Sequence, residues 1–330
     1  MEFETKPIRR HFNSLGLMYF FGTLLIFGVQ YAEVFLIERL PLTGIYDTDV
    51  WLLISTVPMY LISMPLMMLL IRRVPAVSVE KHPITFLQWL TAFFMCYAIM
   101  YLGNLVGLGL TFVIGMVKGS PVDNALVDIA TDISPWTALV IMVLCAPVFE
   151  ELIFRKLLID RTVKYGEKTA VLFSGIFFGL FHGNLNQFAY AFGLGIFWGF
   201  IYVKTGKIRY SICMHMAVNF LGSVASVFLL KSAAYEELIA VSASGDMGAL
   251  MGVVSEHLPG LMLFGLYSLA VLGFLITGIV CLAVHFRKMK LKPAELPLPK
   301  GKLMSAAFLN AGVALFSLFW IIQILLQLMG

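Results

Sequence analysis

The chain has 330 residues, of which 60% are hydrophobic and only 13% are charged. That charged fraction is about half that of an average soluble domain, and a soluble core cannot grow large enough to hide so much apolar surface. The composition therefore excludes an ordinary soluble protein and indicates one that sits in a lipid bilayer. We expect no nucleic-acid partner. The four cysteines show no CxxC spacing, so neither a disulfide framework nor a thiolate zinc site is predicted.

Apolar stretches of membrane length follow one another along the chain. A helical crossing needs roughly 20 mostly apolar residues, and the stretches lack the period-two alternation of barrel strands. They lie at approximately 14–37, 51–71, 84–117, 134–160, 168–183, 187–203, 209–230, 260–286 and 303–328. We therefore predict an all-α, polytopic membrane helix bundle of about nine transmembrane helices. The short stretch 168–183 could be tilted or partly re-entrant.

The basic residues sort with the alternating connections between these helices. On one side lie 20 of the 23 Lys and Arg residues, which leaves only Arg39, Lys118 and Lys231 on the other. The positive-inside rule then places the N-terminus in the cytoplasm and the C-terminus outside. The basic run 287–302 is interpreted as a cytoplasmic linker before the last helix. An ordinary topological signal is the preferred reading of that run, and attraction to anionic lipid is the alternative.

Ionisable groups inside membrane helices are costly and usually mark functional or pairing sites. The first such cluster places Glu150 and Glu151 side by side, about 100° apart on a helix, so that they cannot share one environment. Glu151 and Arg155 are four residues apart in the favourable order for an ion pair. Glu150 has no local partner, and burial in a low dielectric favours the neutral form of such a carboxyl group. We assign Glu151 a supporting role and Glu150 the role of general base; the alternative is that both acids merely end a helix near the surface.

Two further clusters lie on two other predicted helices. Phe178 and His182 are four apart and share a helix face, as do His215 and Asn219. Hydrogen-bond donors at the latter two positions suit stabilisation of a developing oxyanion, although polar side chains in membranes also join helices together. Counted from the expected inner ends of the helices, His182 lies about fourteen residues deep and Glu150 about ten. Unless the helix 168–183 is tilted, His182 is expected to lie deeper than its partners.

Together the three clusters read Glu-Glu-x-x-x-Arg, Phe-x-x-x-His and His-x-x-x-Asn, in that order on three membrane helices. This pattern resembles the CAAX protease and bacteriocin-processing (CPBP) family of intramembrane peptidases, which includes the type II CAAX prenyl endopeptidases. The resemblance covers roughly residues 130–230. It divides the chain into N-terminal helices (1–130), a catalytic core (131–232) and two C-terminal helices with the basic linker (233–330).

The resemblance implies a mechanism for the matching positions. Glu150 and His182 would activate a water molecule, His215 and Asn219 would form an oxyanion hole, and Glu151, Arg155 and Phe178 would support the site. A membrane-associated peptide or protein is the implied substrate. No cofactor is favoured. Zinc is the alternative, with Glu150, His182 and His215 as its three ligands, because catalytic zinc uses three protein ligands and leaves one position open.

Two non-proteolytic functions compete with this interpretation. A membrane scaffold or bacteriocin-immunity-type protein could keep the same fold and use the polar residues for packing alone. A transporter could use Glu150 and His182 as a proton relay, but the sequence shows no repeated pair of broken helices in two halves, which transporter folds often have.

Overall fold

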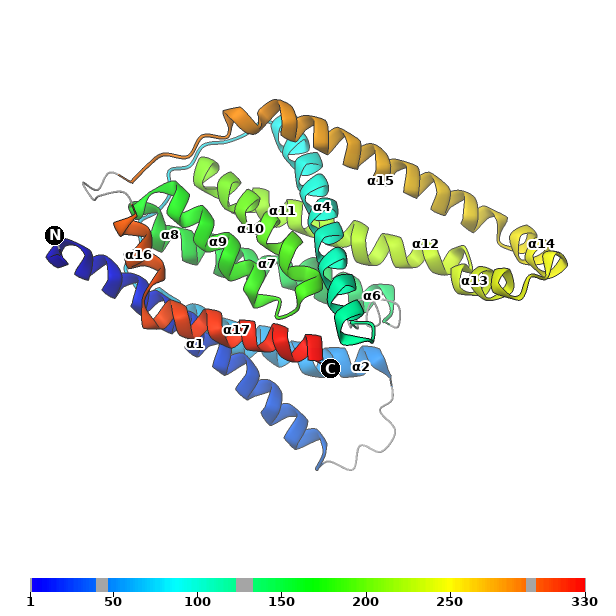
Figure 1. Ribbon diagram of the computed structural model, residues 1–330, viewed down its shortest axis with the longest axis horizontal. Helices are drawn as coiled ribbons and strands as arrows, with labels where there is room; N and C mark the ends of the chain where they lie inside the picture. The colour runs from blue at the N-terminus through cyan, green and yellow to red at the C-terminus, as the bar shows by residue number, and fades with distance from the viewer. Residues whose placement is uncertain (1, 40–46, 123–132, 295–300, 330) are drawn as a thin grey trace.

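The computed structural model describes residues 2–39, 47–122, 133–294 and 301–329. This part of the chain is helical and contains no strand, which confirms the predicted all-α class (Figure 1). Its α-helices are α1 (Glu2–Ile37), α2 (Thr48–Pro58), α3 (Met64–Arg72), α4 (Phe86–Lys118), α6 (Pro135–Ala138), α7 (Ala146–Glu151), α8 (Leu158–Thr162), α9 (Glu167–Phe181), α10 (Leu185–Thr205), α11 (Arg209–Asn219), α12 (Ser226–Ser232), α13 (Tyr235–Ser244), α14 (Met247–Glu256), α15 (Leu258–His285), α16 (Lys302–Phe308) and α17 (Ala311–Met329).

Wider π-helical turns join several of these helices end to end. They are η1 (Met59–Ser63), η2 (Leu139–Cys145), η3 (Leu152–Leu157) and η5 (Phe220–Ala225), and short 3-10 turns η4 (Val163–Tyr165) and η6 (Phe286–Lys288) extend α8 and α15. Continuous membrane-length helices result, so the predicted polytopic bundle is confirmed. Within the described residues, eight helices are long and apolar enough to cross a membrane: Thr5–Ile37, Thr48–Arg72, Phe86–Lys118, Pro135–Tyr165, Leu185–Thr205, Arg209–Ser232, Leu258–Lys288 and Ala311–Met329.

Two expected helices differ from the prediction. The stretch 168–183 forms α9, whose 15 residues rise roughly 22 Å, less than the hydrocarbon thickness of a bilayer. The expected continuous helix 303–328 is broken into α16 and α17 at Asn310, whose side chain donates to Ala307 O and accepts from Val313 N. An asparagine that binds backbone in this way ends one helix and caps the next. Hydropathy is uniform across such a break and does not reveal it.

The connections rich in basic residues meet at one end of the bundle. Val77 N donates to Asp160 O, His82 N to Thr205 O, and Glu167 N to Lys292 O. These three backbone hydrogen bonds join the segments after α3, after α8, after α10 and after α15. The segments that the charge pattern assigned to one side therefore lie together. Arg155 is an exception, because it lies inside a helix and is fully buried.

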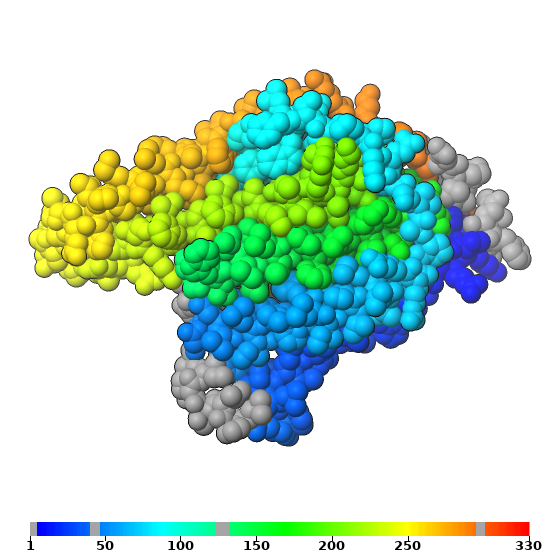
Figure 2. All heavy atoms as spheres, turned by 180° about the vertical axis from the view of Figure 1, so that it is seen from behind, coloured from blue at the N-terminus to red at the C-terminus, as the bar shows by residue number. Residues whose placement is uncertain are grey.

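The helix that carries the first polar cluster lies in the middle of the bundle. Seen from behind, the segment 135–165 (green) lies between α2–α3 and α11–α12 (Figure 2). A continuous buried core joins this segment to α1, α4, α10 and α17, so residues from all three sequence segments contribute to it. Helices α12 to α14 and the first part of α15 project from this core as a long arm, and the rest of α15 packs against α4 (Figure 1).

Two glycines let α4 approach the start of α10 closely. A Cβ atom at Gly103 would lie 2.5 Å from Tyr190 Cα, and one at Gly107 would lie 2.5 Å from Asn186 O. Small residues four apart are the usual means by which membrane helices bring their backbones together. This contact fixes the position of Tyr190 and its neighbours on α10.

Replacing Gly103 with valine is therefore expected to push α4 and α10 apart. The clash is with backbone and cannot be relieved by a side-chain rotation, so we expect a loss of about 1–3 kcal/mol in the free energy of unfolding. Thermal unfolding of the purified protein in detergent measures it. The matched control is Gly109→Val on the same helix, where a Cβ atom meets nothing within 4 Å. Equal losses in both variants would contradict the proposed close approach.

Candidate active site

The two adjacent glutamates lie on α7, a short α-helix held between two π-helical segments, η2 and η3. At the end of η2, Ala146 N donates to Ile141 O, five residues back, so the next acceptor in this register is Met142 O. The residue that would donate to it is Pro147, which has no N–H. The carbonyl of Met142 is thereby left for another donor. Wide turns of this kind occur frequently at functional sites.

Glu151 is the centre of a buried charge cluster. Its Oε1 lies 3.0 Å from Arg155 Nη2, and both side chains are fully buried. The predicted ion pair therefore forms. The same Oε1 accepts a hydrogen bond of 3.2 Å from His215 Nδ1. Because Nδ1 donates to Glu151, the opposite ring nitrogen of His215 is directed elsewhere, and it lies 3.7 Å from Glu150 Oε2.

Phe178 contacts three members of the site. Its ring lies 4.2 Å beneath the Arg155 Cζ and meets the imidazole of His182 edge to face at 4.7 Å and that of His215 at 5.9 Å. A cation over an aromatic face in a desolvated setting is stabilised by the ring quadrupole. Phe178 thus packs against Arg155, His182 and His215, and its supporting role stays a prediction.

His182 lies at the C-terminal end of α9, where its Nδ1 donates to Phe178 O at 2.8 Å. A carbonyl only accepts, so Nδ1 carries the proton, and in the neutral ring Nε2 is an acceptor. The expected mismatch in depth is not present. The helix that holds Glu150 continues to Tyr165 rather than 160, so Glu150 lies fifteen residues from its inner end. His182 likewise lies fifteen residues from Glu167, the first residue of α9.

Asn219 ends α11 and uses part of its amide to join two helices. Its Nδ2 donates to Met142 O at 2.7 Å, the carbonyl that Pro147 leaves without a backbone donor. The amide has a second N–H, so this contact orients Asn219 and leaves one donor for the site. The two roles considered from sequence, oxyanion donor and helix-joining group, are therefore compatible at this residue.

All four predicted catalytic residues line one cavity of about 520 Å³. Glu150 comes from α7, His182 from the end of α9, and His215 and Asn219 from α11. The remaining wall is largely apolar and includes Met100, Met142, Phe181, Leu194 and Trp198. The three sequence clusters thus meet at one place, although they lie on separate helices.

Four further residues of the cavity were not singled out from the sequence: Asn104, Gln187, Tyr190 and Trp198. Gln187 Nε2 donates to Tyr190 Oη at 2.7 Å, which leaves the phenolic O–H of Tyr190 to donate in turn. Trp198 stacks on His215 at 4.4 Å and fixes its ring. A listing of uncharged polar residues inside the apolar stretches would have found Asn104 and Gln187, whereas nothing distinguishes Tyr190 from other membrane tyrosines.

The alternative zinc site was tested against the side-chain arrangement. Within the described residues, no group of three or more His, Cys, Asp and Glu side chains is arranged to hold a metal ion. Glu150, His182 and His215 line the same cavity without forming such a group. Zinc ligation by these residues stays a prediction.

Comparison with known proteins identifies the segment that carries the site. The family described as "Type II CAAX prenyl endopeptidase Rce1-like" matches residues 132–221. A Bacillus subtilis (strain 168) protein named "Putative membrane peptidase YdiL" is 26% identical over 112 residues, which are 33% of this chain and 44% of that protein. Together the two matches support membership in the CPBP family. No solved structure matches it significantly.

The CPBP match spans all the candidate site residues, from Glu150 to Asn219. Both comparisons name peptidases, which supports a membrane peptidase at the level of the family. The match covers less than half the length of the Bacillus subtilis relative. The flanking helices of the present chain therefore lie outside the compared region.

Replacing Arg155 with methionine tests the charge cluster. The substitution leaves the Glu151 carboxylate buried without its partner, and we expect the free energy of unfolding to fall by about 3–5 kcal/mol. Thermal unfolding in detergent measures the loss. The double variant Glu151→Gln/Arg155→Met removes both charges and should recover most of it. A double variant no more stable than Arg155→Met alone would show that the ion pair is not the cause.

Proposed function

We propose that this protein is an intramembrane endopeptidase that hydrolyses a peptide bond of a membrane-associated protein or peptide. The observation that carries the proposal is the convergence of Glu150, His182, His215 and Asn219 on one largely apolar cavity. Proteolysis needs a base, an activated water and donors for the developing oxyanion. Among them, these four side chains provide a base, acceptors that hold a water molecule, and donors for the oxyanion.

Glu150 and His182 are suited to hold and activate the attacking water. A water molecule donates two hydrogens, and the Glu150 carboxylate and the neutral His182 Nε2 are both acceptors. One water bound by both would direct its lone pair away from them, toward a scissile carbonyl carbon. Glu150 would take the proton as the new C–O bond forms and would return it to the leaving amine.

Other polar side chains that line the cavity are suited to the oxyanion. Asn219 has one N–H left after binding Met142 O, and the Tyr190 hydroxyl is held as a donor by Gln187. His215 is fixed by Glu151 and Trp198, and its second ring nitrogen lies 3.7 Å from Glu150 Oε2. Because Nδ1 already donates to Glu151, this second nitrogen donates to an oxyanion only when the ring is protonated. Donors fixed in this way need no reorganisation as charge develops. Tyr190 is an addition to the oxyanion hole expected from the sequence.

Exchange of Glu150 for glutamine tests the general base. The variant keeps shape and removes basicity, so we expect cleavage to fall by about 10²-fold or more while the protein folds and inserts normally. Comparative proteomics of membranes that carry wild-type or Glu150→Gln protein would reveal peptides that accumulate only with the variant. The matched control is Glu80→Gln, an exposed carboxylate on the segment after α3.

Two other outcomes of that comparison distinguish the competing functions. An unchanged peptide pattern and an unchanged cellular phenotype would favour a scaffold or immunity-type protein. Proton-coupled flux in proteoliposomes, abolished by Glu150→Gln, would favour a transporter. Only an accumulating substrate that purified wild-type protein cleaves supports the peptidase.

Metal dependence is tested on the substrate so identified. Because the side chains do not form a metal-binding group, we propose hydrolysis without a metal ion. The cleavage rate should then change less than twofold after stringent chelation. A loss of activity that zinc alone restores would overturn this part of the proposal and leave the peptidase activity standing.

The proposed topology places the N-terminus in the cytoplasm and the C-terminus outside, in a cell membrane. The gathering of the basic connections at one end of the bundle supports this orientation. Residues 300 and 123–132, which contribute to the charge pattern, lie outside the described residues.

A further inference from the structure

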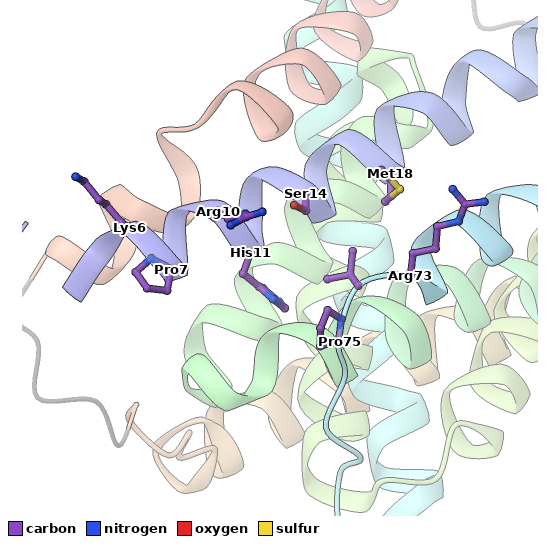
Figure 3. A pocket seen from close by; sticks show the side chains of 9 residues that line it. Lys6, Pro7, Arg10, His11, Ser14, Met18, Arg73 and Pro75 are labelled. Atoms are coloured by element: carbon purple, nitrogen blue, oxygen red, sulfur yellow. The ribbon is translucent and has the colours of Figure 1, made fainter. Parts of the chain in front are cut away.

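A second cavity of about 650 Å³ lies at the end of the bundle where the basic connections meet, and none of its lining residues lines the cavity of the candidate active site. It is formed between the first turns of α1 and the segment that follows α3. Figure 3 shows its lining, in which His11 projects from α1 toward Pro75 and Arg73 stands near Met18. The lining residues are Lys6, Pro7, Arg10, His11, Ser14, Met18, Arg73, Val74 and Pro75.

Among the side chains that the structure describes, the lining combines positive charge with apolar surface and contains no acidic residue. Arg10 and Arg73 are both exposed. Across the described part of the chain, neither arginine has an acidic side chain at ion-pair distance. The same lining includes the apolar side chains of Met18 and Val74. A site of this composition fits a ligand that has both an anionic group and a hydrocarbon part.

Buried hydrogen bonds hold the two walls of this cavity in place. Arg161 donates through Nε to Ile71 O at 2.7 Å, which fixes the end of α3 next to Arg73. Its own carbonyl accepts a hydrogen bond of 2.7 Å from His11 Nε2, which fixes α1. The separation of the walls is thus set by one residue of α8. The cavity is a preformed part of the fold rather than a chance gap between mobile side chains.

We propose that this cavity binds the phosphate group of an anionic phospholipid, with Arg10 and Arg73 on the phosphate and the acyl region along Met18 and Val74. Guanidinium groups match phosphate oxygens in geometry as well as in charge. The membrane supplies such lipids at the level of the basic connections. A soluble phosphate would use the same arginines but would gain nothing from the apolar wall, and this difference favours a lipid.

The test compares two pairs of neighbouring arginines in the full-length protein in detergent. Arg10→Gln/Arg73→Gln removes the two cavity charges. Arg9→Gln/Arg72→Gln removes the same number of charges from the same two segments, at residues that do not line the cavity. The probe is a phosphatidylglycerol, titrated and followed by native mass spectrometry, with phosphatidylcholine and inorganic phosphate as comparison ligands.

We expect the cavity variant to bind phosphatidylglycerol at least tenfold more weakly than wild type, and the control variant to bind it within about twofold. Phosphatidylcholine should bind weakly to all three proteins. Equal weakening in the two variants would reduce the effect to general surface charge and overturn the proposal. Displacement of the lipid by inorganic phosphate at equal concentration would assign the site to a soluble phosphate and overturn the lipid assignment.

Discussion

The buried ion pair between Glu151 and Arg155 is the constraint on which the arrangement of the site depends. Two charges removed from water are costly unless they are well paired, and here Oε1 of the glutamate serves both the arginine and His215. The arginine in turn lies over Phe178 of α9. One pair therefore orders three helices. Glu151 makes these contacts through Oε1, and its neighbour Glu150 lines the cavity.

Close backbone contacts determine how deep each residue of the site lies. Helices α9 and α10 form a hairpin in which Gly175 and Gly195 meet, and Ser174 donates to Phe154 O of the neighbouring helix. These contacts hold α9 beside the helix of Glu150. Fifteen residues separate Glu150 from Tyr165 at the end of its helix, and fifteen separate His182 from Glu167 at the start of α9. His182 consequently reaches the level of the carboxylates even though α9 is short. The short length of α9 thus places His182, at its C-terminal end, beside the other residues of the site.

Much of this organisation could be predicted from the sequence, because membrane helices are long and charges within them are rare. Hydropathy located the helices, and spacing of four residues paired Glu151 with Arg155. The order of three polar clusters brought Glu150, His182 and Asn219 to one cavity. The inner end of that helix at Tyr165 and the break at Asn310 could not be predicted, since local hydrogen bonds decide both. The donor role of Tyr190 depends on Gln187, which only the folded chain places beside it.

The π-helical segments on both sides of α7 have a consequence for how this site can change. A wide turn accommodates one residue more than an α-helical turn, and each residue along a helix rotates the direction of its side chains by about 100°. Deletion of a single residue within η2 would therefore close the wide turn to an α-helical one and leave Glu150 and Glu151 in their present directions. Deletion of a residue from an α-helical turn before Glu150 would instead rotate both glutamates and Arg155 together by about 100° relative to the cavity. The direction in which each residue points from the helix, rather than the length of the helix, distinguishes Glu150, the proposed base, from Glu151 in the ion pair.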